Sequence, residues 1–570
     1  MAYADRVRDA CTRWELALTQ RANRRRLLAG GAAAGGLVIA SSLPGRATRL
    51  AYQDGTPVAS PLASPFASPV ASPVASPSAF GANPFQLGVA SGDPRPDSVV
   101  LWTRLAPAPR DGGGMDPVPY AVRWEIARDE GFAQVALRGE AVAAAPLAHT
   151  VHVDALGLEP DTEYFYRFMV GGEVSPTGRT KTAPAADAAP DGMRFAFASC
   201  AHYEHGYFVA YRHMAEQRFD LILHQGDYIY EMGPGEYDVY DDGPVEGRRF
   251  SGGPNDLFTL EEYRNRYALY RTDPDLQAAH ASAPWATTWD DHEFSNDYAG
   301  LLPEDTKGQP ADVFEARRTN AYQAYYEHLP LRPSSMPRGP EMQLYRRLAY
   351  GSLAQFQILD TRQYRSDQPC GDGVNVRCPA ALDPNTTLTG PEQERWLLQG
   401  LDASPATWNV ISQQVLMAEL EQGPGPVEAY FGDGWGGYPA ARNRILAHML
   451  SRGTSNPVVL TGDIHCAWAN DLKADFADPA SQTVGSEFVC TSITAGGAAS
   501  TSEFFREFLG DAPHIRYFDP RHGGYTGVTV TPERMTAEYL VVEDMRDEDK
   551  PITAAATYVT EAGNPGMHPA

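Results

Sequence analysis

Apolar and polar residues alternate over short stretches between Phe85 and Pro184, and turns rich in Gly, Pro and Asp separate these stretches. A period of two is typical of β-strands that bury one face. The stretches read FQLGVASGD, SVVLWTRL, YAVRWEIARD, HTVHVDAL and TEYFYRFMV. Their number and spacing predict an N-terminal all-β sandwich of immunoglobulin or fibronectin type over residues 83–184. Nothing in this segment indicates catalysis.

The pattern changes after the segment KTAPAADAAPDGM, in which residues 185–193 are the predicted linker. Over residues 194–570 short apolar runs alternate with helical stretches, at Leu257–Arg271, Ala311–His328, Pro391–Leu401 and Ala440–Ser451. Alternation of this kind predicts a mixed sheet covered by helices, and therefore a layered α/β domain. A chain of 570 residues exceeds the usual single core, so two domains are expected.

Chemically distinctive residues stand where four of the apolar runs stop. FAFASC ends in one such residue, and LILHQGDYIY, ATTWDDHEFSND and PVVLTGDIH carry the others. Each run is typical of a buried strand, and the carboxyl ends of strands are where α/β sheets bind ligands. The residues are Cys200, Asp227, Tyr230, Asp291, His292, Asn296, Asp463 and His465.

Metal binding is the chemistry that these residue types share. Carboxylates and an amide suit hard cations, an imidazole suits a first-row transition metal, and a thiolate beside a phenolate favours a trivalent metal. The alternative is that the Asp and Gly residues only form turns. That alternative does not explain why charge recurs wherever a hydrophobic run stops.

The first 82 residues differ from the rest of the chain. The arginines at 24–26 precede an Ala/Gly-rich apolar run, and residues 1–47 resemble a bacterial twin-arginine export signal. The alternative is a basic amphipathic helix followed by a flexible Gly/Ala stretch. Residues 48–82 contain repeats of Ala-Ser-Pro, whose proline density prevents helix and sheet and predicts an extended tether or a cleavable spacer.

The net charge of the chain limits the kinds of molecule that it can bind. The net charge of −25, from 47 basic and 72 acidic residues, argues against nucleic acid and anionic membranes. An anionic substrate would then need positive charge from metals or arginines.

Cys370 and Cys378 flank a polar loop and are expected to form a disulfide in an oxidising compartment, whereas Cys466 and Cys490 are either buried thiols or a second bridge.

Several motifs together resemble the PhoD-type alkaline phosphatases, in the order in which that family has them. They are the twin-arginine signal, FQLGVASGDPRPDSVVLWTRL, ASC, HQGDYIYE, WDDHE, LDTRQYR and LTGDIH. The resemblance implies a metallophosphatase-like αββα sandwich that carries Fe³⁺ and two Ca²⁺ ions. It implies iron ligation by Cys200, Asp227, Tyr230 and His465, with Asp227 as the bridge. Asp291, Asn296 and Asp463 lie where calcium or bridging ligands are expected.

The resemblance also implies a reaction, in which water activated by the metals hydrolyses a phosphate ester without a covalent phosphoenzyme. His292 is expected to contact a substrate oxygen or protonate the leaving alkoxide, or alternatively to orient the acidic ligands. Arg362 is expected to bind phosphate, with a structural ion pair as the alternative. The implied protein is a monomer, exported by the twin-arginine machinery, and secreted or tethered to the cell envelope.

Two departures from the family pattern affect these expectations. Asn296 is followed by Asp297 where a second asparagine is usual, and His202 stands near a position where a glutamine is usual. Two other functions remain open at this point. One is a phosphodiesterase of phospholipase D type on the same fold, and the other is a non-catalytic calcium-binding or adhesion module of the envelope.

Overall fold

A computed structural model describes residues 80–237, 240, 243–253, 255–304, 308–423, 428–496 and 504–570. The chain divides into two compact units, Met1–Pro73 and Val74–Ala570, and the description below concerns the second. The predicted export signal and nearly all of the predicted tether lie outside the described residues. In the part of the chain that the structure describes, no helix is both long enough and apolar enough to cross a membrane.

The larger sheet has ten strands, of which β9, β10, β11 and β1 run parallel to one another at its centre. In order across the sheet the strands are β24 (Asn564–Pro569), β23 (Ile552–Glu561), β22 (Arg534–Val542), β21 (Gly523–Val530), β9 (Met193–Ala198), β10 (Leu221–His224), β11 (Pro284–Thr287), β1 (Val89–Arg95), β2 (Ser98–Arg104) and β5 (Thr150–Leu156).

The second sheet has seven strands, with a parallel centre formed by β13, β15, β17 and β19. Its strands in order are β12 (Arg346–Tyr350), β13 (Ala354–Ile358), β15 (Trp408–Ser412), β17 (Pro457–Thr461), β19 (Thr483–Val489), β18 (Ala467–Lys473) and β20 (Ile515–Asp519). Buried side chains of both sheets, such as Phe195 and Leu223 from one and Phe356 and Leu460 from the other, form one core. The two sheets therefore pack face to face.

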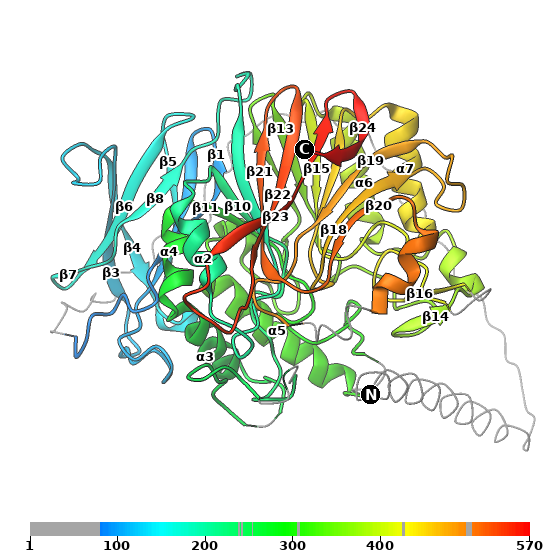
Figure 1. Ribbon diagram of the computed structural model, residues 1–570. Helices are drawn as coiled ribbons and strands as arrows, with labels where there is room; N and C mark the ends of the chain where they lie inside the picture. The colour runs from blue at the N-terminus through cyan, green and yellow to red at the C-terminus, as the bar shows by residue number, and fades with distance from the viewer. Residues whose placement is uncertain are drawn as a thin grey trace, which may run out of the picture. The chain divides into compact units, whose positions relative to one another are not determined.

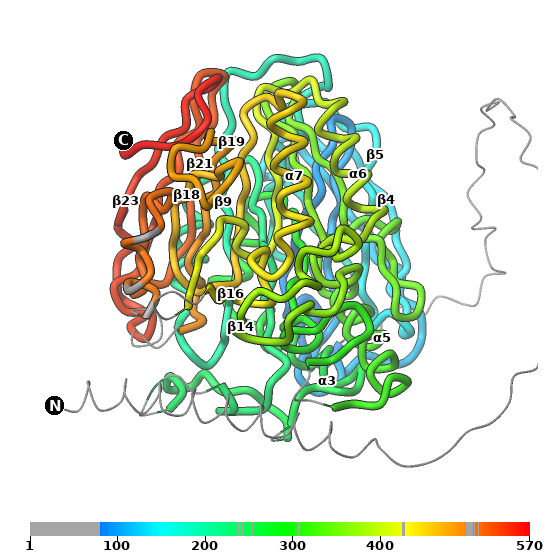
Figure 2. The backbone as a smooth tube through the Cα atoms, turned by 90° about the vertical axis from the view of Figure 1, so that its right-hand side faces the viewer, coloured from blue at the N-terminus to red at the C-terminus, as the bar shows by residue number. Residues whose placement is uncertain are grey.

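Helices cover the outer faces of both sheets (Figure 1). On the larger sheet these are α2 (Val209–Glu216), α3 (Leu260–Arg271), α4 (Pro274–Ser282) and α5 (Ala311–His328). On the smaller sheet α6 (Gly390–Ala403) and α7 (Pro439–Arg452) lie side by side (Figure 2). The four predicted helical stretches are confirmed to within a few residues. One reason is local: Thr259 and Glu262 form a capping box at the start of α3.

The N-terminal region contributes a further sheet of β4 (Val135–Ala143), β3 (Tyr120–Ala127), β6 (Glu163–Val170) and β7 (Glu173–Val174), with β8 (Gly178–Lys181) paired to β6. Val122 and Phe168 of this sheet share a core with Leu101 of β2 and Val153 of β5. The predicted β-rich N-terminal region, consistent with a sandwich, is thus confirmed. Its second layer, however, is the edge of the ten-stranded sheet.

This continuity arises from the parallel pairing of β1 with β11, in which Ser91 lies opposite Pro284 and Gly92 opposite Trp285. A Cβ atom at Gly92 would come within 2.3 Å of the Pro330 carbonyl oxygen, so the close approach requires glycine. The alternating pattern of β1 predicts a strand but cannot specify this distant partner. The segment boundaries assigned from the sequence stay predictions.

A two-stranded sheet of β14 (Val374–Val376) and β16 (Ala429–Phe431) stands apart from the large sheets. Cys370 and Cys378 form the predicted disulfide, which closes the loop around β14. Cys466 and Cys490 are buried and not disulfide-bonded, so the second bridge that the sequence left open does not form. Short 3₁₀ helices lie at η1 (Ala145–Leu147), η2 (Pro333–Ser335), η3 (Pro379–Leu382) and η4 (Phe504–Asp511).

Candidate metal centre

The distinctive residues at the ends of the strands lie together. Cys200 follows β9, Asp227 follows β10, Asp291 follows β11 and Asp463 follows β17. Three groups have ligand atoms within 4.8 Å of one another: Cys200, Asp227 and His465; Asp227, Asp291 and His292; and Asp290, Asp291 and Asp463. Because Asp227 belongs to two groups and Asp291 to two, the three groups form one continuous cluster.

The backbone at these strand ends adopts conformations that residues other than glycine rarely adopt. The φ angles are 61° at Cys200, 54° at Asp227, 65° at Asp463 and 55° at His465. Left-handed backbone at such residues costs of order 1–3 kcal/mol each and persists only where the surrounding structure enforces it. A Cβ at Gly226 would meet the Asp290 nitrogen at 2.4 Å, so this glycine lets the two loops approach each other. The turns aim the side chains into the cluster.

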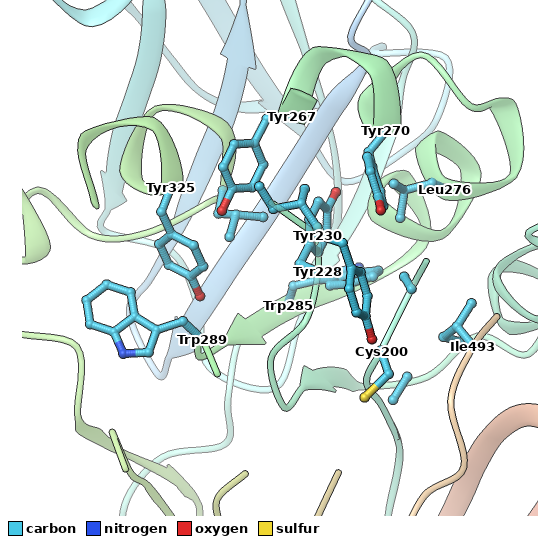
Figure 3. Packing of buried hydrophobic residues seen from close by; sticks show 14 of the residues in the cluster. Cys200, Tyr228, Tyr230, Tyr267, Tyr270, Leu276, Trp285, Trp289, Tyr325 and Ile493 are labelled. Atoms are coloured by element: carbon cyan, nitrogen blue, oxygen red, sulfur yellow. The ribbon is translucent and has the colours of Figure 1, made fainter. Parts of the chain in front are cut away.

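The four residues to which the resemblance assigns iron ligation lie around one point. They are Cys200, Asp227, Tyr230 and His465. The Tyr230 hydroxyl donates to Asp227 Oδ2 at 3.1 Å and lies 3.1 Å from His465 Nε2. It points toward Cys200 from within a buried aromatic cluster (Figure 3). The Cys200 sulfur lies 3.1 Å from the Ser199 hydroxyl. This set therefore offers thiolate, carboxylate, phenolate and imidazole donors together.

Burial disfavours charge on most of these donors. It raises the pKa of Cys200, Asp227 and Tyr230 well above their usual values, and repulsion among the three adds to the shifts of Cys200 and Tyr230. Burial lowers the pKa of His465 to about 3, so its imidazole is neutral and able to act as a ligand. A bound cation would reverse the penalty on the anions, because opposite charge favours the ionised form. The donor set fits a strongly Lewis-acidic metal.

The neighbouring carboxylates share one buried cation, Arg362. Its guanidinium is fully buried, is bonded to Asp290 through Nε, and lies 2.8 Å from Asp433. It lies 3.7 Å from Asp291 and 4.0 Å from Asp463. These contacts are those of a structural ion pair, which is the alternative role that the sequence left open for Arg362. Arg362 does not line the pocket described below, and its predicted contact with phosphate stays a prediction.

The positive charge of Arg362 does not balance this group. Burial and repulsion by Asp290 raise the pKa of Asp463 well above its usual value, although Arg362 opposes the shift. Burial also raises the pKa of Asp290, to about 6. Burial acts in the same direction on Asp291, but Arg362 and His292 outweigh it and lower the pKa of that carboxyl. Excess buried negative charge of this kind fits hard cations such as Ca²⁺.

His292 and Asn296 are both held by Glu231, to which the sequence reasoning assigned no role. His292 Nδ1 lies 2.7 Å from one Glu231 oxygen, and the Asn296 backbone N–H donates to the other at 2.8 Å. The Asn296 side-chain amide donates to Glu304 at 3.2 Å. Burial lowers the pKa of His292, but Asp291 and Glu231 outweigh it and raise the pKa well above the usual value.

Glu293 is a second residue whose role the sequence did not show. Its buried carboxylate accepts backbone N–H bonds from Asp227 at 3.0 Å, Tyr228 at 2.6 Å and Asp290 at 2.9 Å. The loops that follow β10 and β11 are therefore fixed to each other by one side chain. The WDDHE motif includes this glutamate, but only the fold shows which N–H groups it accepts.

Of the two residues that depart from the family pattern, Asp297 lines the pocket described below and His202 does not. The Asp297 backbone N–H donates to Asp291 Oδ2 at 2.7 Å, and its side chain adds a carboxylate to the pocket. Burial, Asp433 and Asp291 raise the pKa of Asp297 well above its usual value. His202 is buried, with its ring 3.6 Å from that of His205 and 4.6 Å from that of Tyr230. It belongs to none of the three ligand groups found among the described residues.

A pocket of about 420 Å³ opens onto the cluster. Among the described residues that line it, none is a lysine or an arginine. Positive charge for an anionic substrate must therefore come from a protonated histidine of the lining or from bound cations. The lining residues are Asp227, Tyr237, Asp291, His292, Asn296, Asp297, Val374, Leu416, Ala418, Leu420, Gln422, Phe431, Gly434, Gly436, Asp463, Ile464, His465 and Phe505.

Comparison with known proteins agrees with this fold and site. Residues 195–539 match the PhoD-like phosphatase family, and residues 70–184 match the N-terminal domain of PhoD-like phosphatases. The chain belongs to the PhoD-like phosphatase family, and is thus a phosphoric ester hydrolase. Alkaline phosphatase D of Bacillus subtilis (strain 168) is 49% identical over 489 residues, which cover 86% of this chain and 82% of that protein. A solved structure of PhoD superposes with a TM-score of 0.82 at 48% identity, over 86% of this chain and 93% of that one.

Proposed function

We propose that this protein is a secreted alkaline phosphatase that releases inorganic phosphate from phosphate esters at an iron–calcium centre. The observation that carries the proposal is the convergence of Cys200, Asp227, Tyr230 and His465 beside a second group rich in carboxylates. We further infer that the four layers form a metallophosphatase-type αββα sandwich, preceded by an immunoglobulin-like or fibronectin-like sandwich. Family membership removes the support for a non-catalytic calcium-binding or adhesion module.

The residues divide between the two kinds of metal by donor chemistry. Cys200, Asp227, Tyr230 and His465 would hold Fe³⁺, with Asp227 as the bridge to the second group. Asp291, Asn296 and Asp463 would hold Ca²⁺ through oxygen atoms. When bound, these cations supply Lewis acidity, which stabilises negative charge developing on a phosphoryl oxygen and makes water a stronger nucleophile near neutral pH.

The remaining chemistry belongs to the protein. His292 lines the pocket, and Glu231 holds its Nδ1. Its Nε2 is then the atom that can carry a proton to the leaving alkoxide. Glu293 keeps Asp227 and Asp290 in fixed relative positions, so the site is organised before substrate enters. We expect hydrolysis in a single displacement without a phosphoenzyme.

The decisive experiment is elemental analysis of the exported, chelator-free protein. We expect about one iron and about two calcium ions per chain. Calcium without iron would contradict the thiolate–phenolate site. A matched Cys200→Ser variant should lose iron while it retains calcium.

A phosphodiesterase of phospholipase D type is the second candidate function. The observation in its favour is that the described lining has no lysine or arginine, since a diester carries less negative charge than a monoester dianion. The ratio of monoester to diester turnover, measured on the same metal-loaded preparation, separates the two functions.

Location and assembly rest on the sequence alone. We infer export by the twin-arginine machinery from the arginines at 24–26, and attachment or spacing at the envelope from residues 48–82. We expect a monomer. Replacement of the arginines at 24–26 by lysine, which keeps the positive charge, should retain the protein in the cytoplasm.

Replacement of Tyr230 by Phe should remove the visible absorbance of a ferric phenolate while the fold persists. The ring is fully buried and its packing would be kept, whereas the hydroxyl contacts with Asp227 and His465 would be lost. The absorption spectrum of the iron-loaded variant measures the effect. Tyr228→Phe is the matched control, because its hydroxyl lies 2.9 Å from His280, whereas that of Tyr230 contacts Asp227 and His465. Unchanged colour in Tyr230→Phe would refute the phenolate assignment.

Removal of metal should make stability fall as pH rises. Asp227 and Asp463 have folded-state pKa values raised above the usual 3.8, so their contribution to stability is complete below that pH and is lost as pH rises through the folded-state values. Added Ca²⁺ should restore the melting temperature at high pH, because it favours the ionised carboxylates. Thermal melts across pH, with chelator and with Ca²⁺, test this. An equal dependence of the melting temperature on pH with chelator and with Ca²⁺ would contradict this expectation.

A further inference from the structure

The pocket contains a second surface whose chemistry the metal centre does not use. We call it the apolar lining: Val374, Leu416, Ala418, Leu420, Phe431 and Ile464. It shares one cavity of about 420 Å³ with the carboxylates and imidazoles of the cluster. A part of an ester that extends from the phosphoryl group across this surface would contact hydrocarbon. An alcohol rich in hydroxyl groups would leave those hydroxyls without partners there.

One part of the apolar lining is held in place by a buried glutamate. Glu487, in β19, is fully buried, and its carboxylate accepts backbone N–H bonds from Met417 at 2.7 Å and Ala418 at 2.9 Å. Thr461 and Asn470 donate to the same carboxylate at 2.8 and 3.0 Å. The loop that carries Leu416, Ala418 and Leu420 is thus fixed to the sheet. Glu293 does the same for the loops of the metal cluster.

The other part comes from β14 and β16, which lie side by side below α7 in Figure 2. Val374 and Phe431 are directly paired across these strands. The disulfide closes the loop around β14, and Arg377, just after that strand, pairs with Glu419 at 2.9 Å. Glu419 also pairs with Arg442 of α7 at 2.6 Å. Both parts of the apolar lining are therefore preformed.

We propose that the apolar lining is the subsite for the alcohol portion of the ester, and that the substrate class is phosphoric esters of apolar aliphatic alcohols. The inference rests on the proposed function, which places the phosphoryl group at the metal cluster. Each methylene that enters the apolar lining should favour binding about fourfold. The apolar lining itself contains no charged side chain, which agrees with an uncharged alcohol portion.

The test compares ethyl phosphate with hexyl phosphate, whose alcohols have nearly equal acidity, by release of inorganic phosphate from the metal-loaded enzyme. We expect kcat/KM to be at least about tenfold higher for hexyl phosphate, through KM. In the Val374→Ser/Phe431→Ser variant the ratio of kcat/KM for hexyl phosphate to that for ethyl phosphate should fall to near unity. Val376→Ser is the matched control, since Val376 lies in the same strand, is 60% exposed and does not line the pocket.

Equal kcat/KM for the two esters in the wild-type enzyme would overturn the inference, as would an undiminished preference in the double variant. If the double variant fails to fold, Val374→Thr, which keeps the side-chain shape, should show a smaller loss of preference. Binding of hexylphosphonate and ethylphosphonate, measured by calorimetry, separates this inference from the proposed function. Tighter binding of hexylphosphonate, together with no turnover of either phosphate ester, would support the apolar subsite and contradict the phosphatase mechanism. Equal binding would overturn the subsite.

Discussion

Replacement of Asp227 by Asn should lower kcat by about a hundredfold to a thousandfold or more. Asp227 is the common member of two ligand groups, so the change removes negative charge between both metal positions. Its Oδ2 also accepts the Tyr230 hydroxyl at 3.1 Å. The amide of Asn is nearly the same size as the carboxylate, and the fold should persist.

Steady-state kinetics with measured metal content tests this expectation. Asp312→Asn is the matched control, because Asp312 is exposed in the first turn of α5 and far from the ligand groups in sequence. We expect the control to retain full activity and metal. An Asp227→Asn enzyme with full iron and calcium content and near-normal kcat would show that Asp227 is not the bridge.

Replacement of Arg362 by Met should lower the free energy of unfolding by about 3–5 kcal/mol when metal is absent. The guanidinium is fully buried and lies within 4.0 Å of the carboxylates of Asp290, Asp291, Asp433 and Asp463. Its removal leaves Asp290, Asp291 and Asp463 without this cation, whereas Asp433 keeps its ion pair with Arg365. Added Ca²⁺ should recover part of the loss, because a cation in the cluster replaces some of the missing charge.

Urea denaturation with chelator and with Ca²⁺ measures this loss. Arg452→Met is the matched control, since Arg452 is 59% exposed and its ion pair with Asp402 lies at the surface. Surface pairs contribute about 0–1 kcal/mol, so the control should change little. A loss in Arg362→Met no larger than in the control would mean that the aspartates are neutral in the metal-free protein.

Helices and strands with strong local signals were predicted well. The α3 and α5 stretches have helical spacing over 12 and 18 residues, and α3 also has a capping box. Helices α2 and α4 have only 8 and 9 residues, too short for a periodic pattern, and they were missed. The pairing of β1 with β11 was missed as well, because register between distant strands leaves no local pattern.

The residues of the cluster are recognisable in the sequence because each one stands where an apolar run stops at a strand end, and their role as metal ligands stays a prediction. The residues that hold these side chains in place are not recognisable in this way. Glu231, Glu293 and Glu487 act on backbone or side-chain groups of loops that the fold brings to them. Asp433 gains its role because the fold brings Arg362 to 2.8 Å and Arg365 to 2.5 Å from its carboxylate. A buried carboxylate of this kind resembles any other acidic residue in the sequence.

The sequence by itself determined the order of β-rich and α/β segments, the strand ends where the carboxylate, thiol, phenol and imidazole side chains stand, and the Cys370–Cys378 bridge, because these depend on local pattern and residue type. Only the tertiary structure decided that Arg362 lies among four aspartates and that the N-terminal strands extend the large sheet. It alone placed an apolar lining in the same pocket as the metal cluster. These features depend on distances between segments far apart in the chain, and such distances are set by packing.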